Sequence, residues 1–224
     1  MFEVYKQNDI RGFTFDQFVD FLFDHEVPPE FSADGQRIDP WYYDSEVECS
    51  PVDVVALYTR LFSEPAFLLD SFSREKLEQG FWAIMGQSLE CSVGEVIWSS
   101  EAEFAARAEC VRSMFHLYEK LFAIDPLETS SNMWWDSLAY DWHCGNRDRK
   151  NGGEDLLMQE VMFETLEQIL DLSSVDCQVA ALHGLGHLHH PGTAELVSRY
   201  LDRKPPKNPE LRNYAIAAAK FEVL

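Results

Sequence analysis

Four histidines lie within one short segment and form the densest group of potential metal ligands in the sequence: His183, His187, His189 and His190. In a helix each residue turns about 100° around the axis, so His187 lies about 40° and His190 about 340° from His183. These three imidazoles would share one face and could offer nitrogen atoms to a metal ion. We therefore take His183, His187 and His190 as the candidate metal ligands.

Two features of the same segment favour ordinary packing or surface histidines instead. Residues 179–194 contain no aspartate or glutamate, and the His-Glu-x-x-His order of metalloproteases is absent. Pro191 is expected to end the helix before His190 becomes helical. The sequence therefore predicts no cofactor, and a metal-dependent enzyme that uses His183 and His187 is kept as the alternative.

No other combination of residues indicates catalysis. His143 and Cys144 could be a base and a nucleophile, but adjacent residues of a helix point about 100° apart and do not face each other. The chain has no G-x-S-x-G elbow and no kinase signature, and its Gly184-x-Gly186 falls inside an expected helix instead of after a strand. We predict no catalytic residues.

The composition is strongly acidic, because 39 Asp and Glu outnumber 18 Lys and Arg and give a formal net charge of -21. Nucleic acid is a poor ligand for such a chain, since phosphate binding needs a cationic surface. A basic protein or peptide is the expected partner, although the same charge could serve only to keep the chain soluble. The sequence leaves the oligomeric state open.

The five cysteines are widely spaced: Cys49, Cys91, Cys110, Cys144 and Cys177. Their odd number and the lack of any C-x-x-C predict reduced thiols, not disulfides or a thiolate zinc site. No apolar run reaches the roughly 18 residues needed to span a bilayer, and the N-terminus does not resemble a signal peptide. We predict a cytoplasmic protein that does not bind membranes.

Apolar residues recur at helical spacing along most of the chain, and no alternating β pattern competes with them. The first expected helix, residues 13–25, carries Asp16, Asp20 and Asp24 four apart on one acidic ridge. Residues 27–50 are expected to form an irregular connection. Three further helices are expected to begin near Ser50, Ser73 and Ser100. Five more are expected at about 133–142, 154–172, 175–189, 193–203 and 209–222. The prediction is a single all-α domain, residues 1–224, with about 9–10 helices and its best internal boundary at the loop 145–153.

One helical pattern occurs twice in the last 49 residues, at a spacing of 34. The first copy reads Ala181-x-x-Gly184-Leu185-Gly186-x-Leu188-x-His190-Pro191, and the second reads Leu211-Arg212-x-x-Ala215-x-x-Ala218-Ala219. These motifs resemble the bacterial HEAT-like repeat over about residues 154–224, although Gln178 and Lys220 depart from its usual arginine and glycine. The resemblance implies a right-handed α-solenoid of helical hairpins, and such families mostly bind other macromolecules.

The leading functional hypothesis is a non-catalytic interaction scaffold with an acidic surface, of the kind that inhibitors and immunity proteins of cationic toxins use. A concave face of stacked helices would present six charged residues: Glu160, Glu164, Glu167, Glu195, Arg199 and Asp202. A second candidate surface mixes aromatic anchors with acids: Trp134, Trp135, Asp136 and Asp141. Ordinary solvated helix faces and core aromatic rings are the alternatives, and a self-associating adaptor is a third functional class.

Overall fold

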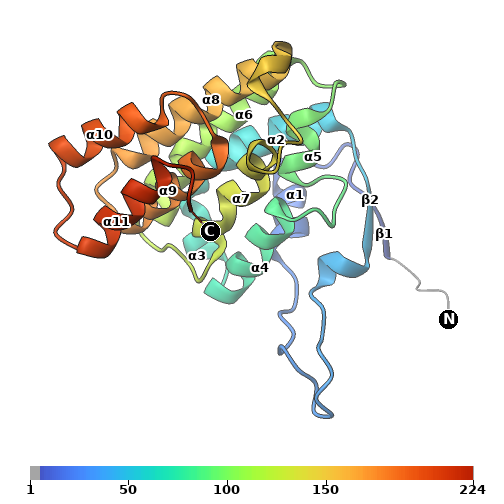
Figure 1. The fold of residues 1–224 in the computed structure, drawn as a ribbon. Coiled ribbons are helices and arrows are strands. Elements are labelled where there is room, and N and C mark those ends of the chain that lie inside the picture. Colours follow the sequence, from blue (N-terminus) through green and yellow to red (C-terminus); the bar gives the residue numbers. More distant parts are fainter. Residues whose placement is uncertain (1–5, 224) are drawn as a thin grey trace. The chain divides into compact units, whose positions relative to one another are not determined.

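The computed structural model describes residues 6–223 and is mostly helical (Figure 1), which confirms the predicted all-α class. Within that range the α-helices are α1 Phe15–Phe23, α2 Pro51–Ser63, α3 Leu68–Ser71, α4 Arg74–Met85, α5 Val93–Trp98, α6 Phe104–Leu117, α7 Ser130–His143, α8 Gly153–Leu170, α9 Val175–Leu188, α10 Thr193–Arg203 and α11 Pro209–Ala218. None of these described helices is long and apolar enough to cross a membrane.

The described residues group into two compact units. Unit 1 comprises the chain up to Leu61 together with Ala66–Cys110, and unit 2 comprises Phe62–Pro65 and the chain from Val111 onward. Two of the three divisions fall inside α2 and α6 and the third follows Pro65, whereas the loop 145–153, expected as the best boundary, lies within unit 2. The single domain and the solenoid order of its hairpins remain predictions.

Unit 1 contains two short strands that the sequence pattern did not predict. Strand β1, Lys6–Asp9, pairs in parallel with β2, Ser45–Glu48, in the register Lys6 opposite Ser45. The expectation of no strand is therefore wrong over these residues. The reason is local: β1 is only four residues long and entirely polar, so it carries no apolar alternation for a sequence reading to detect.

Helix α1 forms the acidic ridge of unit 1, as expected. Thr14 caps its N-terminus, and Thr14 and Gln17 satisfy each other's backbone N–H groups in a capping box. Its buried face packs against α4 at Gly80, where an added Cβ would lie 2.2 Å from Cδ1 of Phe23 and 2.9 Å from the carbonyl oxygen of Leu22. Glycine at this position therefore permits the close approach of the two helices, which leaves the aspartates on the opposite, exposed side.

Helix α9 is the centre of unit 2 and packs against α7, α8 and α11 (Figure 1). Every residue from Ala180 to Leu188 is buried. An added Cβ at Gly184 would lie 2.7 Å from Cβ of Trp135, so glycine lets α9 approach α7 closely. Ser174 caps the start of α9, and His189 at φ 52° ends it one residue before the predicted end. This close contact brings polar residues of α7 and α9 together.

Candidate functional site

An open cleft of about 600 Å³ lies in unit 1 between α1 and the segment Phe67–Lys76. Its lining combines acidic, aromatic and hydroxyl side chains: Asp16, Val19, Asp20, Asp24, Phe67, Ser71, Phe72, Ser73 and Lys76. We call this the acidic cleft. The ridge of aspartates that the sequence predicted on α1 therefore forms one wall of a concave surface.

The charges of the acidic cleft are only partly neutralised. Lys76 Nζ lies 2.6 Å from Oδ1 of Asp24, and this hydrogen bond lowers the pKa of Asp24. Asp16 and Asp20 are exposed and form no ion pair with any residue that the structure describes. The cleft therefore keeps two free carboxylates about 6 Å apart, the spacing of side chains one helical turn from each other.

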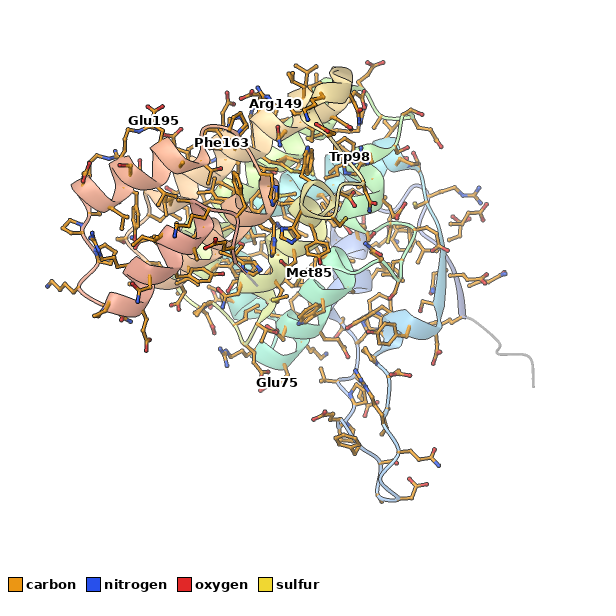
Figure 2. All side chains as sticks on the ribbon, in the orientation of Figure 1. Glu75, Met85, Trp98, Arg149, Phe163 and Glu195 are labelled. Atoms are coloured by element: carbon orange, nitrogen blue, oxygen red, sulfur yellow. The ribbon has the colours of Figure 1, made fainter. Side chains whose placement is uncertain are left out.

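The acidic face predicted on α8 and α10 is more fully neutralised. Arg199 lies between two glutamates, with Nη2 2.9 Å from Oε1 of Glu167 and Nη1 2.9 Å from Oε1 of Glu195. Glu195 itself points outward from α10 (Figure 2). Glu164 and Asp202 are exposed and have no ion pair among the described residues. The structure thus brings Glu167, Arg199 and Glu195 together, but as a charge-compensated group.

Glu160, the remaining acid of that predicted face, also has partners within unit 2. Its carboxylate forms an ion pair with Arg149 and lies 3.2 Å from Nε2 of His190. Burial raises the pKa of Glu160, but the hydrogen bonds from Arg149 and His190 outweigh that effect and hold the pKa below its usual value. This carboxylate is therefore already engaged inside the fold.

The two tryptophans proposed as binding anchors lie in the core. Trp134 and Trp135 are both fully buried. The Trp134 ring meets Phe62 edge-on with centroids 5.4 Å apart, and its Nε1–H lies 3.3 Å from the sulfur of Met114. Neither indole is accessible to a partner, which corrects their assignment to a contact surface. The combination of tryptophans and acids in this segment therefore belongs to a helix whose tryptophan side chains lie in the core.

Asp136 and Asp141, the acids of that same predicted surface, have different surroundings on α7. Asp141 Oδ2 lies 3.3 Å from Nε of Arg147, and its Oδ1 accepts a hydrogen bond from Asn146 at 3.0 Å. Asp136 instead faces α9. Its Oδ1 lies 2.7 Å from Nε2 of His183 and 2.9 Å from Nε2 of His187.

Asp136, His183 and His187 form a group that we call the Asp–His–His cluster. One potential ligand atom from each residue can be chosen so that all three lie within 4.8 Å of one another. The side chains of His183 and His187 are 9% and 4% exposed, and that of Asp136 is 28% exposed. The cluster is therefore mostly buried and reaches solvent on the side of Asp136.

The electrostatics keep Asp136 ionised. Burial acts to raise its pKa, but the hydrogen bonds and electrostatic interactions with His183 and His187 outweigh burial and leave the pKa well below its usual value. On the far side of His183, Nδ1 makes a short hydrogen bond with the hydroxyl of Tyr214 on α11. Burial raises the pKa of Tyr214 to about 12, so this hydroxyl is neutral at physiological pH.

Aromatic rings also surround His187. The rings of Tyr140 and His143, both on α7, meet it edge-on with centroid distances of 5.3 and 5.0 Å. Its Nδ1 is buried and has no hydrogen-bond partner among the described residues. The ring of His187 is thus oriented by Asp136 on one edge and by ring packing elsewhere.

His190, the third candidate metal ligand, does not join the cluster. Its ring stacks on Phe163 with centroids 3.9 Å apart, and its Nδ1 accepts the backbone N–H of Gly192 at 3.1 Å. Burial lowers its pKa more than Glu160 raises it. His190 therefore faces α8 as part of a separate His–Glu pair, because the chain leaves the helix at His189 and the angular spacing of α9 no longer applies.

The sequence indicated part of the cluster but missed its remaining members. His183 and His187 were found by their spacing, whereas Asp136 was assigned to a contact surface and Tyr214 was not noticed. The signal for Asp136 was its place among buried residues of α7, where an ionised carboxylate needs a buried partner.

No family model, curated protein or solved structure matches this chain.

Proposed function

We propose that this protein binds a basic peptide segment of a partner protein in the acidic cleft of unit 1. The single observation that carries the proposal is the cleft of about 600 Å³ with the exposed, unpaired carboxylates of Asp16 and Asp20 on one wall. This keeps the predicted class of function, a non-catalytic binding protein, and moves its site from the C-terminal helices to α1.

Charge complementarity supports a basic partner. Because Asp16 and Asp20 stand one helical turn apart, they can meet two lysines or arginines about 6 Å apart, as on one face of a partner helix. The formal net charge of -21 would accelerate the approach of a cationic partner and make association sensitive to salt. Lys76 neutralises the charge of Asp24 at one end of the α1 ridge. The uncompensated negative charge of the ridge therefore lies near Asp16 and Asp20.

Apolar surface in the same cleft supports a peptide over a free cation. Phe67 is exposed, Phe72 is half-buried, and both line the cleft beside Val19. Exposed aromatic rings bordered by charges are typical of the anchor positions of protein interfaces. A helical segment with lysine or arginine on one face and leucine-type residues on the adjoining face would contact both the carboxylates and the apolar side chains of the cleft.

The neutralised face of α8 and α10 supports placing the site in unit 1. Arg199 already occupies the carboxylates of Glu167 and Glu195, so a basic partner would have to displace an existing ion pair there. The HEAT-like arrangement of residues 154–224 stays part of the proposal as a scaffold. It is supported by the helical pairs α8–α9 and α10–α11, each of which packs together.

A defined peptide tests the proposal directly. The probe is a labelled amphipathic helix with lysines four apart and leucines on the adjoining face, titrated with the full chain and followed by fluorescence anisotropy. We expect binding that weakens with rising salt, and an approximately tenfold loss of affinity when Asp16→Asn and Asp20→Asn are combined, since each exposed ion pair contributes up to about 1 kcal/mol. The control combines Glu164→Gln with Asp202→Asn, which changes the net charge by the same amount on exposed sites of unit 2. Equal losses for both double variants would reduce the effect to net charge and refute a site in the cleft.

A further inference from the structure

The Asp–His–His cluster has the composition of a metal site and lies apart from the acidic cleft, in unit 2. We infer that Asp136, His183 and His187 bind a divalent transition-metal ion of the zinc class. The inference is independent of the proposed peptide binding. It rests on the type, spacing and support of three side chains from two packed helices.

The donor set selects the class of metal. Two imidazole nitrogens and one carboxylate oxygen suit zinc and its neighbours, whereas magnesium and calcium prefer sites made almost entirely of oxygen. The carboxylate oxygen and the two imidazole nitrogens already lie within 4.8 Å of one another, so one ion can reach all three donors. Three protein ligands leave one tetrahedral position for water or an added ligand, as in zinc sites that are not fully closed by protein.

The geometry requires only small movements. Ligand atoms around tetrahedral zinc lie about 3.3 Å apart, which follows from metal–ligand distances near 2.0 Å. The corresponding distances here are 2.7 Å from Asp136 Oδ1 to His183 Nε2 and 2.9 Å to His187 Nε2. Each Nε2 atom would therefore move away from Oδ1 of Asp136 by about 0.4–0.6 Å. Each imidazole would bind as the neutral tautomer that carries its proton on Nδ1, so that the lone pair of Nε2 faces the ion.

The backbone fixes the two histidines on one face. His183 and His187 are one turn apart on α9, so both rings project toward α7. Gly184, between them, allows the helices to approach until Asp136 reaches both rings, because any Cβ there would collide with Trp135. A site assembled from two helices held at this distance is largely preorganised, which favours binding over a site that must form on a loop.

His183 has the second hydrogen bond that orients a metal-binding histidine, whereas Nδ1 of His187 has no partner among the described residues. The second ring nitrogen of His183 is hydrogen-bonded to the Tyr214 hydroxyl, which fixes the ring and directs Nε2 toward Asp136. Tyr214 lies on α11, so residues of three helices meet at the cluster. Asp136 is the most exposed of the three ligands and Tyr140, one turn along α7, is exposed, so an ion can enter from that side.

The structure also provides an internal comparison. His190 and Glu160 form a histidine–carboxylate pair at 3.2 Å within the same unit, and Arg149 binds the same carboxylate. That pair has two potential ligands and a competing cation, whereas the Asp–His–His cluster has three ligands and no arginine or lysine within ion-pair distance of Asp136 among the described residues. We therefore expect a metal ion to bind the Asp–His–His cluster and not the His190–Glu160 pair.

The test uses the full chain, purified without a histidine tag and stripped of metal with a chelator. Zinc ion is titrated against a competing chromophoric chelator, and bound metal is counted by elemental analysis after gel filtration. We expect one equivalent of zinc. Asp136→Asn, His183→Gln and His187→Gln should each lower the affinity by at least about 100-fold, and Tyr214→Phe by about tenfold, the range typical of outer-sphere partners. Circular dichroism and thermal unfolding verify that each variant folds.

His190→Gln is the matched control, because it removes a buried histidine that also faces a carboxylate, and it should leave both stoichiometry and affinity unchanged. If Asp136→Asn or a histidine variant fails to fold, Co²⁺ bound to the unaltered protein gives the second measurement, since its absorption spectrum reports nitrogen and oxygen ligands in a tetrahedral site. Sub-stoichiometric zinc, or one equivalent that survives His183→Gln and His187→Gln, would overturn the inference and leave the cluster as a histidine–carboxylate network that only joins α7 to α9.

Discussion

The aspartates on α1 and Asp136 on α7 have the same side chain in opposite surroundings. Asp20 lies in an open cleft and forms no ion pair with any described residue, whereas Asp136 is mostly enclosed and its Oδ1 contacts two imidazoles. An exposed carboxylate contributes free charge to binding and little to stability. A partly buried carboxylate is retained only with partners, and losing one of them leaves an uncompensated charge.

The comparison shows why net charge is a poor guide to the location of a binding surface. Most of the acids predicted to form the C-terminal face are already paired with Arg149 or Arg199. The partners that a carboxylate already has therefore decide whether it can attract another molecule. The following predictions separate the two environments, beginning with the largest expected effect.

Adding one methyl group at the α7–α9 contact should affect the buried region most. Gly184→Ala places a Cβ 2.7 Å from Cβ of Trp135 and 2.8 Å from Cδ2 of Leu166, and both neighbours are fully buried. We expect the free energy of unfolding to fall by about 1–3 kcal/mol, measured by urea denaturation, because overpacking exceeds the helix propensity gained.

Gly80→Ala is the matched change in unit 1, where the new Cβ would meet Phe23 and the carbonyl of Leu22. It should also destabilise the protein, but it should alter peptide binding at the acidic cleft and not zinc affinity. Gly184→Ala should do the reverse. If each variant changed peptide binding and zinc affinity equally, the acidic cleft and the Asp–His–His cluster would not be independent sites.

Removing the charge of Asp136 should alter stability in a pH-dependent way. The folded-state pKa of Asp136 lies below its unfolded value of about 3.9, so its contribution is present at neutral pH and is lost as the pH falls below about 4 toward the folded-state pKa. We expect Asp136→Asn to cost about 1.5–3 kcal/mol at pH 7, the range for hydrogen bonds to a charged group, and to cost less at pH 3.

Asp20→Asn is the corresponding substitution on the exposed ridge. Because Asp20 has no partner in the part of the chain that the structure describes, the stability of this variant should stay within about 0.5 kcal/mol of the parent protein at both pH values. Chemical denaturation at pH 3, 5 and 7 makes the measurement. A cost for Asp136→Asn that did not depend on pH would show that its carboxylate charge is not what the two histidines stabilise.

The sequence predicted the starts of α2, α4, α10 and α11 from explicit signals, but the helix expected near Ser100 begins only at Phe104, and the short helices α3 and α5 were not predicted. Asn208 before Pro209 marked the start of α11, and the glycine and prolines around α10 marked both of its ends correctly. The short strands β1 and β2 were missed because four residues carry too little periodicity. Local pattern therefore determined the helices, while the pairing of two distant four-residue segments depended on tertiary contact.

The candidate sites were predictable only as far as their residues share one helix. The Asp16–Asp24 ridge and the His183–His187 pair were both found from spacing alone. Asp136 and His183 are 47 positions apart and meet only because α7 packs on α9, which no single-helix argument contains. Trp134 and Trp135 were misassigned because buried core rings and interface anchors have the same composition.

The smallest expected effect on stability concerns Arg199. Arg199→Gln would remove the cation between Glu167 and Glu195, both of which are partly or fully exposed, so we expect a loss below about 1 kcal/mol in thermal or chemical unfolding.

The same change leaves two carboxylates without a partner on α8 and α10, which converts a compensated surface into one like the acidic cleft. The labelled lysine-rich peptide should then bind with increased affinity or at a second site, and the gain should disappear in high salt because exposed charges are screened. Arg212→Gln, at an exposed position of α11, makes the same change of net charge and serves as the control. No gain from Arg199→Gln over this control would mean that paired and unpaired carboxylates attract the peptide equally, which would remove the distinction between the two surfaces.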